Sequence, residues 1–254
     1  MLIKKLALVA VAAAATLPAQ AALTAGDIAV VAYNTDTADN FAWVALVDIA
    51  ANTTINFTDS SWQGSAFRVT EHLDAAGGGP LSWKSASALA AGSVVRFTGN
   101  GSVSWSTGTA TGTVLNLANG GDQIFGFTGA IAAPNFLTGT QFAHANGIIA
   151  SPTVSNSTNT TNVPTGLSLN AGTMVNLGNF DNGYYKGATT GTKAELLSKI
   201  GNVANWTRTD SGDYATSVWA SSFTVTAVPE PESYALMLAG LGVMGFIARR
   251  RKQA

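Results

Sequence analysis

The chain has 254 residues, no cysteine, and a nearly balanced charge of 13 Lys+Arg against 14 Asp+Glu. Without cysteine it has no disulfide, no thiolate nucleophile and no cysteine-type metal site. The two ends hold six of the Lys and Arg residues and two of the Asp and Glu residues, which leaves the middle of the chain with 7 Lys+Arg and 12 Asp+Glu. A mildly acidic middle argues against nucleic acid and anionic lipid as its partners.

The beginning of the chain has the layout of a secretory signal peptide over residues 1–21. Lys4 and Lys5 form a basic start, and residues 6–15 are an uncharged apolar run. A helix of the folded protein is the alternative, but the run is short and Pro18 follows it closely. We therefore predict export through the general secretory route.

The cleavage site follows from the small residues at the end of this segment. Ala19 and Ala21 form the A-x-A pattern that signal peptidase recognises. This pattern predicts Ala22 as the first residue of the mature chain.

The middle of the chain, residues 22–227, has the composition of β structure. Short β-prone runs recur between clusters of Gly, Asn and Asp, which form turns. The strands predicted from these runs are 27–33, 41–49, 54–58, 94–98, 113–117, 123–128, 174–177 and 218–225. In the second run, Phe41 and Trp43 share one face while Val44 and Leu46 share the other, so this strand is expected to be covered on both sides. Many short strands with little helical periodicity predict an all-β sandwich or barrel.

The first strands also carry a family resemblance. Residues 26–34, 41–49 and 54–59, with Gly121 and Asp122 at the start of a later strand, are similar to lamin-tail-like domains of bacterial exported proteins. The resemblance implies an immunoglobulin-like β-sandwich and an attachment or accessory role, and it supplies no activity. Residues after position 140 depart from a compact version of that domain, so extra strands or an insertion are expected there.

One short helix is predicted over residues 193–200. Thr192 and Glu195 have the spacing of a capping box, in which each side chain accepts a hydrogen bond from a backbone N–H at the start of the helix. Gly201 is predicted to end the helix in the left-handed conformation. Residues 151–166 are rich in Ser, Thr and Asn, so they are predicted to form a long loop that is too polar to build a core.

The best candidate for a ligand site is the acidic loop of residues 34–40. Asp36 and Asp39 place carboxylates at spaced positions between two predicted strands, and Ca²⁺ requires such hard oxygen ligands. The spacing is not that of an EF-hand, and Asp and Asn are also ordinary turn formers. The turn is the favoured interpretation, and Asp36 and Asp39 are kept as a calcium candidate.

No catalytic constellation is evident. The two histidines, His72 and His144, lie far apart and in no zinc-binding motif, so His72 next to Glu71 is read as a surface residue. No G-x-S-x-G elbow and no phosphate-binding loop is present, although a triad involving some other serine stays open.

The six tryptophans leave two alternatives open. They fill the core, or the exposed ones stack on sugar rings. The core interpretation is favoured, with Trp43 inside a strand, and Trp62 and Trp83 near loops are the surface candidates.

The end of the chain has three parts in order: an acidic proline-rich segment, an apolar run and a basic cluster. They are Val228, Pro229, Glu230 and Pro231, then residues 233–248, then Arg249, Arg250, Arg251 and Lys252. A helix over the apolar run reaches about 24 Å, which makes it a marginal transmembrane helix. The basic cluster would stay cytoplasmic and fix the orientation.

These three parts resemble the PEP-CTERM sorting signal of Gram-negative bacteria that make exopolysaccharide. The resemblance implies recognition and removal of the tail by an exosortase, a membrane enzyme with a cysteine nucleophile. It covers about the last 27 residues, and the prolines would present an extended peptide to that enzyme.

The sequence therefore predicts three segments: a signal peptide (1–21), a β-sandwich body (22–227) and a sorting and anchor segment (228–254). The expected function is that of an exported, non-enzymatic protein with a structural, adhesive or glycan-associated role at the cell surface or in the extracellular matrix. Its expected partners are signal peptidase, an exosortase-like enzyme, the inner membrane as a transient anchor, and exopolysaccharide as a further candidate. No cofactor and no nucleic acid are expected. The alternative is an exported hydrolase, of nuclease or phosphoesterase type, with an accessory β domain.

Overall fold

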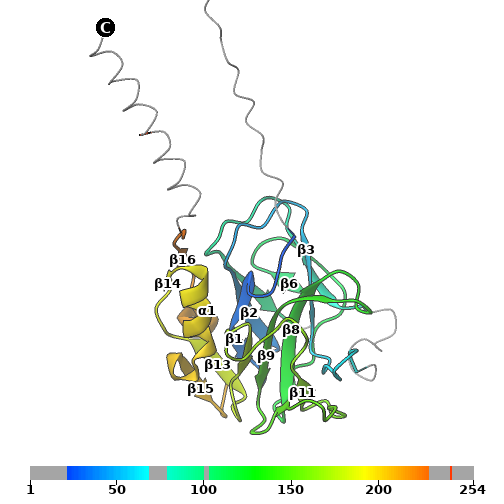
Figure 1. The fold of residues 1–254 in the computed structure, drawn as a ribbon. Coiled ribbons are helices and arrows are strands. Elements are labelled where there is room, and N and C mark those ends of the chain that lie inside the picture. The colour runs from blue at the N-terminus through cyan, green and yellow to red at the C-terminus, as the bar shows by residue number, and fades with distance from the viewer. Residues whose placement is uncertain (1–21, 69–78, 100–102, 229–240, 242–254) are drawn as a thin grey trace, which may run out of the picture.

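The computed structural model describes residues 22–68, 79–99, 103–228 and 241, and it shows a sandwich of two six-stranded sheets (Figure 1). The first sheet has the order β15-β13-β1-β2-β5-β6, formed by Trp206–Thr209, Asn182–Tyr185, Ile28–Asn34, Asn40–Ala45, Val94–Thr98 and Ser104–Trp105. The second has the order β12-β9-β8-β3-β4-β7, formed by Met174–Asn176, Asn135–Phe142, Asp122–Thr128, Thr54–Thr58, Leu81–Lys84 and Thr109–Thr111. The predicted all-β sandwich is confirmed.

Smaller elements complete the described part of the chain. The strand pairs are β10 (Ile148–Ile149) with β11 (Thr161–Asn162), and β14 (Thr190–Gly191) with β16 (Thr224–Val225), each pair parallel. The helices are α1 (Lys193–Gly201), η2 (Val203–Asn205) and η3 (Thr216–Val218). The helix α1 contacts β12 and β14 at the side of the sandwich, as Figure 1 shows.

The space between the sheets is filled by aromatic rings. The ring centroid of Phe57 from β3 lies 5.2 Å from that of Phe41 and 5.4 Å from that of Trp105, both on the opposite sheet. Trp43 meets Trp83 edge to face at 5.0 Å. Edge-to-face and tilted contacts suit the ring quadrupoles and add to the gain from burial.

A second apolar cluster covers the outer face of the second sheet. Because side chains alternate along a strand, β8 sends Ile124 into the main core and Phe125 and Phe127 to the other side. There they pack with Trp62 and Phe67, which belong to the segment that follows β3. The part of the second sheet formed by β8 and β9 is therefore buried on both faces.

The strand over residues 41–47 was predicted to be covered on both sides, and this is confirmed. Every residue of β2 is buried, and β2 lies between β1 and β5 in the middle of its sheet. Its apolar run has no polar face because neither face meets water.

The predicted strand at 113–117 is wrong, because carboxylates rather than a neighbouring strand take the backbone N–H groups of this region. The N–H of Asn116 donates to Asp59 at 2.7 Å, and the N–H of Ala118 donates to Asp122 at 2.8 Å. The sequence pattern shows the β-prone residues of this stretch, but it does not show that Asp59, which follows β3, accepts from Asn116.

Other boundaries were also wrong. Residues 218–225 form part of η3, an irregular stretch and the short strand β16 instead of one long strand. The strands β4, β9, β13 and β15 were not predicted. In β9, Gly139 and four polar residues interrupt the apolar pattern, yet all its residues but the first are buried.

The helix prediction is confirmed at its start and wrong at its end. Thr192 and Glu195 form the capping box, and the buried face consists of Leu196, Leu197 and Ile200. Gly201 is the last helical residue and not a left-handed cap. The C-cap is Asn202, with φ −88° and ψ 109°, and its N–H donates to the carbonyl oxygen of Lys199.

The polar stretch 151–166 is more ordered than predicted. It contains β11 and the buried residues Ser155, Thr161 and Asn162. Asn162 donates to the carbonyl oxygens of Ile149 and Thr153 and accepts from the N–H of Ser155, so hydrogen bonds offset the cost of its burial.

None of the helices in the described ranges has both the length and the apolar composition needed to cross a membrane. The apolar run 233–248 that was predicted as a transmembrane helix lies outside the described residues, apart from Leu241.

Candidate functional site

The N-terminal end of the body is fastened to the sandwich from Leu23 onward. Leu23 is buried, and its carbonyl oxygen accepts a hydrogen bond of 2.7 Å from the side-chain amide of Asn135. Asp27 accepts from the N–H of Thr24 at 2.6 Å and forms an ion pair with Lys193 of α1. The predicted mature N-terminus, Ala22, is exposed and directly precedes this anchored segment.

The C-terminal end is fastened by residues 219–226, which we call the C-terminal strap. Trp219 and Phe223 of the strap are buried in the main core. The ring of Phe223 stacks on Tyr185, with centroids 5.8 Å apart. The guanidinium of Arg96 donates to the carbonyl oxygens of Trp219 and Ala220, each at 3.4 Å.

Backbone hydrogen bonds hold the strap at three further points. The N–H of Phe223 donates to Gly92 at 2.8 Å, that of Thr224 to Thr189 at 2.8 Å, and that of Thr226 to Gly191 at 2.9 Å. Gly92 has φ +88°, and a Cβ there would lie 2.1 Å from the carbonyl oxygen of Phe223. Only glycine allows the strap to approach so closely.

After Thr226, Ala227 and Val228 are exposed, and Val228 has 68% of its surface accessible. The other predicted sorting residues, Pro229, Glu230, Pro231, Arg249, Arg250 and Arg251, lie outside the described residues, as do Ala19 and Ala21 of the predicted signal cleavage site. The first described residues and β16 both lie at the upper end of the sandwich in Figure 1.

The acidic loop of residues 34–40 is closed by hydrogen bonds within the protein. The carboxylate of Asp213 accepts from the N–H groups of Asp36, Thr37 and Ala38 at 3.1 to 3.2 Å. One carboxylate oxygen of Asp36 accepts from the side chain of Asn182 at 2.8 Å and from the N–H of Gly212 at 2.7 Å. These bonds are those of a braced turn, and calcium binding by Asp36 and Asp39 stays a prediction.

Asp39 points toward a different group of residues. The pKa of Asp39 is raised from 3.8 to about 6, chiefly by burial and also by the nearby carboxylates of Asp59 and Asp213, while a hydrogen bond with the backbone of Leu117 acts to lower it. Asp39, Asp59 and Asp122 thus hold one loop through its successive residues 116–118.

Of the two histidines, His144 is the one that lies among the described residues. His144 follows β9, and its Nδ1 accepts from the N–H of Asn146 at 3.2 Å. His72 lies outside the described residues. Within the described ranges, no group of three or more His, Cys, Asp or Glu side chains is placed to hold a metal ion.

The core interpretation of the tryptophans is confirmed. All six are buried, including Trp62 and Trp83, which the sequence suggested as surface candidates. Trp83 donates its indole N–H to the carbonyl oxygen of Thr107 at 2.7 Å, and Trp206 donates to that of Ile200 at 2.8 Å. The alternative that Trp62 or Trp83 stacks on a sugar ring is therefore wrong, because other side chains and loops cover both indole rings.

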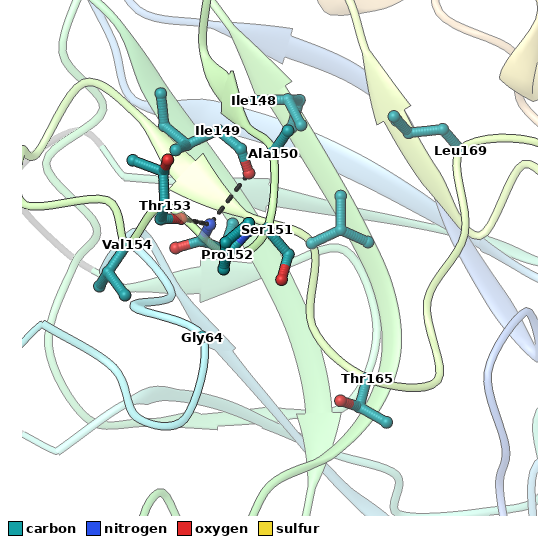
Figure 2. A pocket seen from close by; sticks show the side chains of 12 residues that line it. Gly64, Ile148, Ile149, Ala150, Ser151, Pro152, Thr153, Val154, Thr165 and Leu169 are labelled. Atoms are coloured by element: carbon teal, nitrogen blue, oxygen red, sulfur yellow. Dashed lines mark hydrogen bonds between the residues drawn. The ribbon is translucent and has the colours of Figure 1, made fainter.

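The structure shows a groove of about 440 Å³ that was not predicted (Figure 2). Its walls are residues 148–154 and parts of the segment 162–169, and Gly64 lies at its edge. The dashed lines in Figure 2 are the bonds from the side-chain amide of Asn162, which fix the wall at Ile149 and Thr153.

Among the described residues that line the groove, none has an ionisable side chain. Val154 and Leu169 at its rim are 56% and 42% exposed, and the hydroxyl residues Ser151, Thr153 and Thr165 lie among them. The run of Ser, Thr and Asn between two prolines was the sequence signal for this site, but it was read as a plain loop.

Asp39→Asn provides a test of the carboxylate-held loop. A carboxyl whose pKa is raised on folding binds its proton more tightly in the folded state, so the stability of the wild type falls as pH rises from about 4 to about 6 and stays lower above it. Asn keeps the acceptor without the charge. We expect Asp39→Asn to raise the free energy of unfolding at pH 8 by about 1 kcal/mol, a value reduced for solvent screening, and to leave it unchanged at pH 4. Urea unfolding at both pH values measures this, and an equal effect at both would contradict it.

Comparison with known protein families identifies a sorting motif at the end of the chain. Residues 227–252 match the family model of the PEP-CTERM protein-sorting motif. No curated protein and no solved structure matches the chain. The matched segment begins at the residue that follows Thr226, the last residue of the strap with a described hydrogen bond to the sandwich. The chain thus carries the sorting motif of exosortase substrates, which implies export and membrane-linked sorting.

Proposed function

We propose that this chain is a non-enzymatic structural or adhesive protein of the cell surface or extracellular matrix, released there by an exosortase-type enzyme. The observation that carries the proposal is the position of the sorting motif, which starts where the folded body ends. The N-terminal boundary supports it in the same way, since the anchored segment starts one residue after the predicted cleavage site. Removal of both ends would leave every described contact of the sandwich in place.

We further propose that the body is an immunoglobulin-like sandwich of the lamin-tail-like class. The support is the order of its first strands, in which β1 and β2 pair as an antiparallel hairpin and the Gly26-Asp27 turn precedes β1. The role implied by that class is attachment and not catalysis.

The groove is the surface that best suits attachment. The described lining residues carry no charge, which favours a neutral partner, and their mixture of apolar and hydroxyl groups suits a polyhydroxylated chain. The groove lies near β11, at the lower end of the sandwich in Figure 1 and away from β16. A body held at the membrane by its tail would therefore present the groove outward. We propose a neutral exopolysaccharide as its partner.

Mass spectrometry of the protein from cells and from medium tests the sorting proposal. We expect a mature chain that begins at Ala22 and lacks Arg249, Arg250 and Arg251. Replacing Pro229, Glu230 and Pro231 together by alanine should leave the tail attached and keep the protein in the membrane fraction, while Val218→Ala in the body should be processed normally. Intact ends at Met1 and Ala254 in the wild type would contradict the proposal.

Retention of the protein by the cell's own exopolysaccharide tests the groove. Leu169→Asp places a charge at the apolar rim, which costs the contact more than about 1 kcal/mol and should lower retention at least about fivefold. The matched control is Val203→Asp, since Val203 is 37% exposed and does not line the groove. Equal retention of both variants and the wild type would exclude the groove as the contact surface.

A further inference from the structure

The distance between the folded body and the sorting motif is very short. Ala227 and Val228 are the residues between Thr226 and Pro229, and an extended chain covers at most about 3.6 Å per residue. Pro229 therefore lies within about 11 Å of a residue that is hydrogen-bonded to β14, which is about the spacing of two packed sheets. An enzyme that binds the Pro-Glu-Pro segment in extended form therefore finds only two residues, Ala227 and Val228, between that segment and the hydrogen-bonded Thr226.

Detachment of the strap would lengthen the extended peptide between the folded body and the Pro-Glu-Pro segment. The eight residues of the strap, 219–226, would add about 27 Å if they left the sandwich. The strap can separate as one local unit, because its described attachments are the short strand β16, the buried rings of Trp219 and Phe223, two hydrogen bonds from Arg96 and a few backbone bonds. Segments with few buried contacts open locally at lower free energy than the core of a domain.

We propose that local detachment of the C-terminal strap controls access of the sorting enzyme to the Pro-Glu-Pro segment, an inference that rests on the proposed function. The docked strap keeps the tail close to the body and slows processing. The detached strap presents it as a free extended peptide. After processing, the strap docks again and the released body regains its full set of contacts.

The chain offers a direct way to lock the strap. Ser93 and Ser222 face each other as an antiparallel bridge, and the bond from the N–H of Phe223 to Gly92 makes them a non-hydrogen-bonded pair. Such pairs have Cα atoms about 4.5 Å apart, within the range of a disulfide. The natural chain has no cysteine, so Ser93→Cys with Ser222→Cys gives one unambiguous bond.

The experiment follows tail removal in the producing cells by pulse–chase and mass spectrometry. We expect the oxidised double variant to lose its tail at least about tenfold more slowly than the wild type, since processing of a locally opened segment tracks its open population. A reductant and each single cysteine variant should restore the wild-type rate. A locked protein processed at the wild-type rate would overturn the inference and leave the proposed function standing. A wild type that keeps its tail would overturn both.

A second variant loosens the strap without changing its sequence. Gly92→Ala brings a Cβ against the carbonyl oxygen of Phe223 and should speed tail removal. Gly166→Ala is the matched control, because Gly166 has a similar φ of +94° and nothing within 4 Å of its added Cβ. Hydrogen exchange of the full chain adds a readout that needs no enzyme: the amides of Thr224 and Thr226 should exchange far faster than those of β2, and Gly92→Ala should speed them further. Exchange as slow as that of β2, or equal processing of the two glycine variants, would contradict a detachable strap.

Discussion

The apolar interface between the two six-stranded sheets is the constraint on which the rest of the structure depends. The chain has no cysteine, so burial of aromatic and aliphatic side chains has to supply the stability that disulfides give to many small exported domains. The cluster of Phe41, Phe57 and Trp105 joins the two sheets, and Phe125 and Phe127 extend the apolar packing to the outer face of the second. Both chain ends are fastened to this core.

Different interactions hold the two ends of the folded body, and each end lies directly beside one of the expected cleavages: removal of the signal peptide at the start and removal of the tail at the end. At the start, Asp27 connects the segment before β1 to Lys193 of α1, while Leu23 enters the core. At the end, Phe223 enters the core from the strap, and the exposed residues Ala227 and Val228 follow. The sorting motif therefore directly follows the strap, which is held by the rings of Trp219 and Phe223, by Arg96 and by a few backbone hydrogen bonds. In the proposed mechanism, detachment of the strap from the body therefore controls the rate at which the tail is removed.

The parts of the fold that depend on neighbouring residues were predictable from the sequence. The apolar character of Trp43 and Val44 on opposite faces correctly indicated a central strand, and Thr192 with Glu195 marked the start of α1 because a capping box needs only four residues. The resemblance of the tail to the PEP-CTERM sorting signal was visible in the sequence, because the three parts of that signal lie in contiguous residues, and the family match over residues 227–252 confirms it.

The parts that depend on distant residues were not predictable. The N–H groups of Asn116 and Leu117 bond to Asp59 and Asp39, which lie far earlier in the chain. The groove depends on Asn162, whose side chain joins turns that look like polar linker in the sequence. The position of the strap depends on the absence of a side chain at Gly92, more than a hundred residues before it. Local patterns contain none of this information.

The division between the strap and the tail is the central claim, and chains that end at different residues test it most directly. A mature chain ending at Val228 should have the same free energy of unfolding in urea as one that keeps the tail, because the described contacts of the body end at Thr226. A chain ending at Val218 lacks Trp219 and Phe223 and should lose at least about 3 kcal/mol, the cost of removing a buried aromatic side chain. Equal stability of the chains that end at Val218 and Val228 would contradict the account.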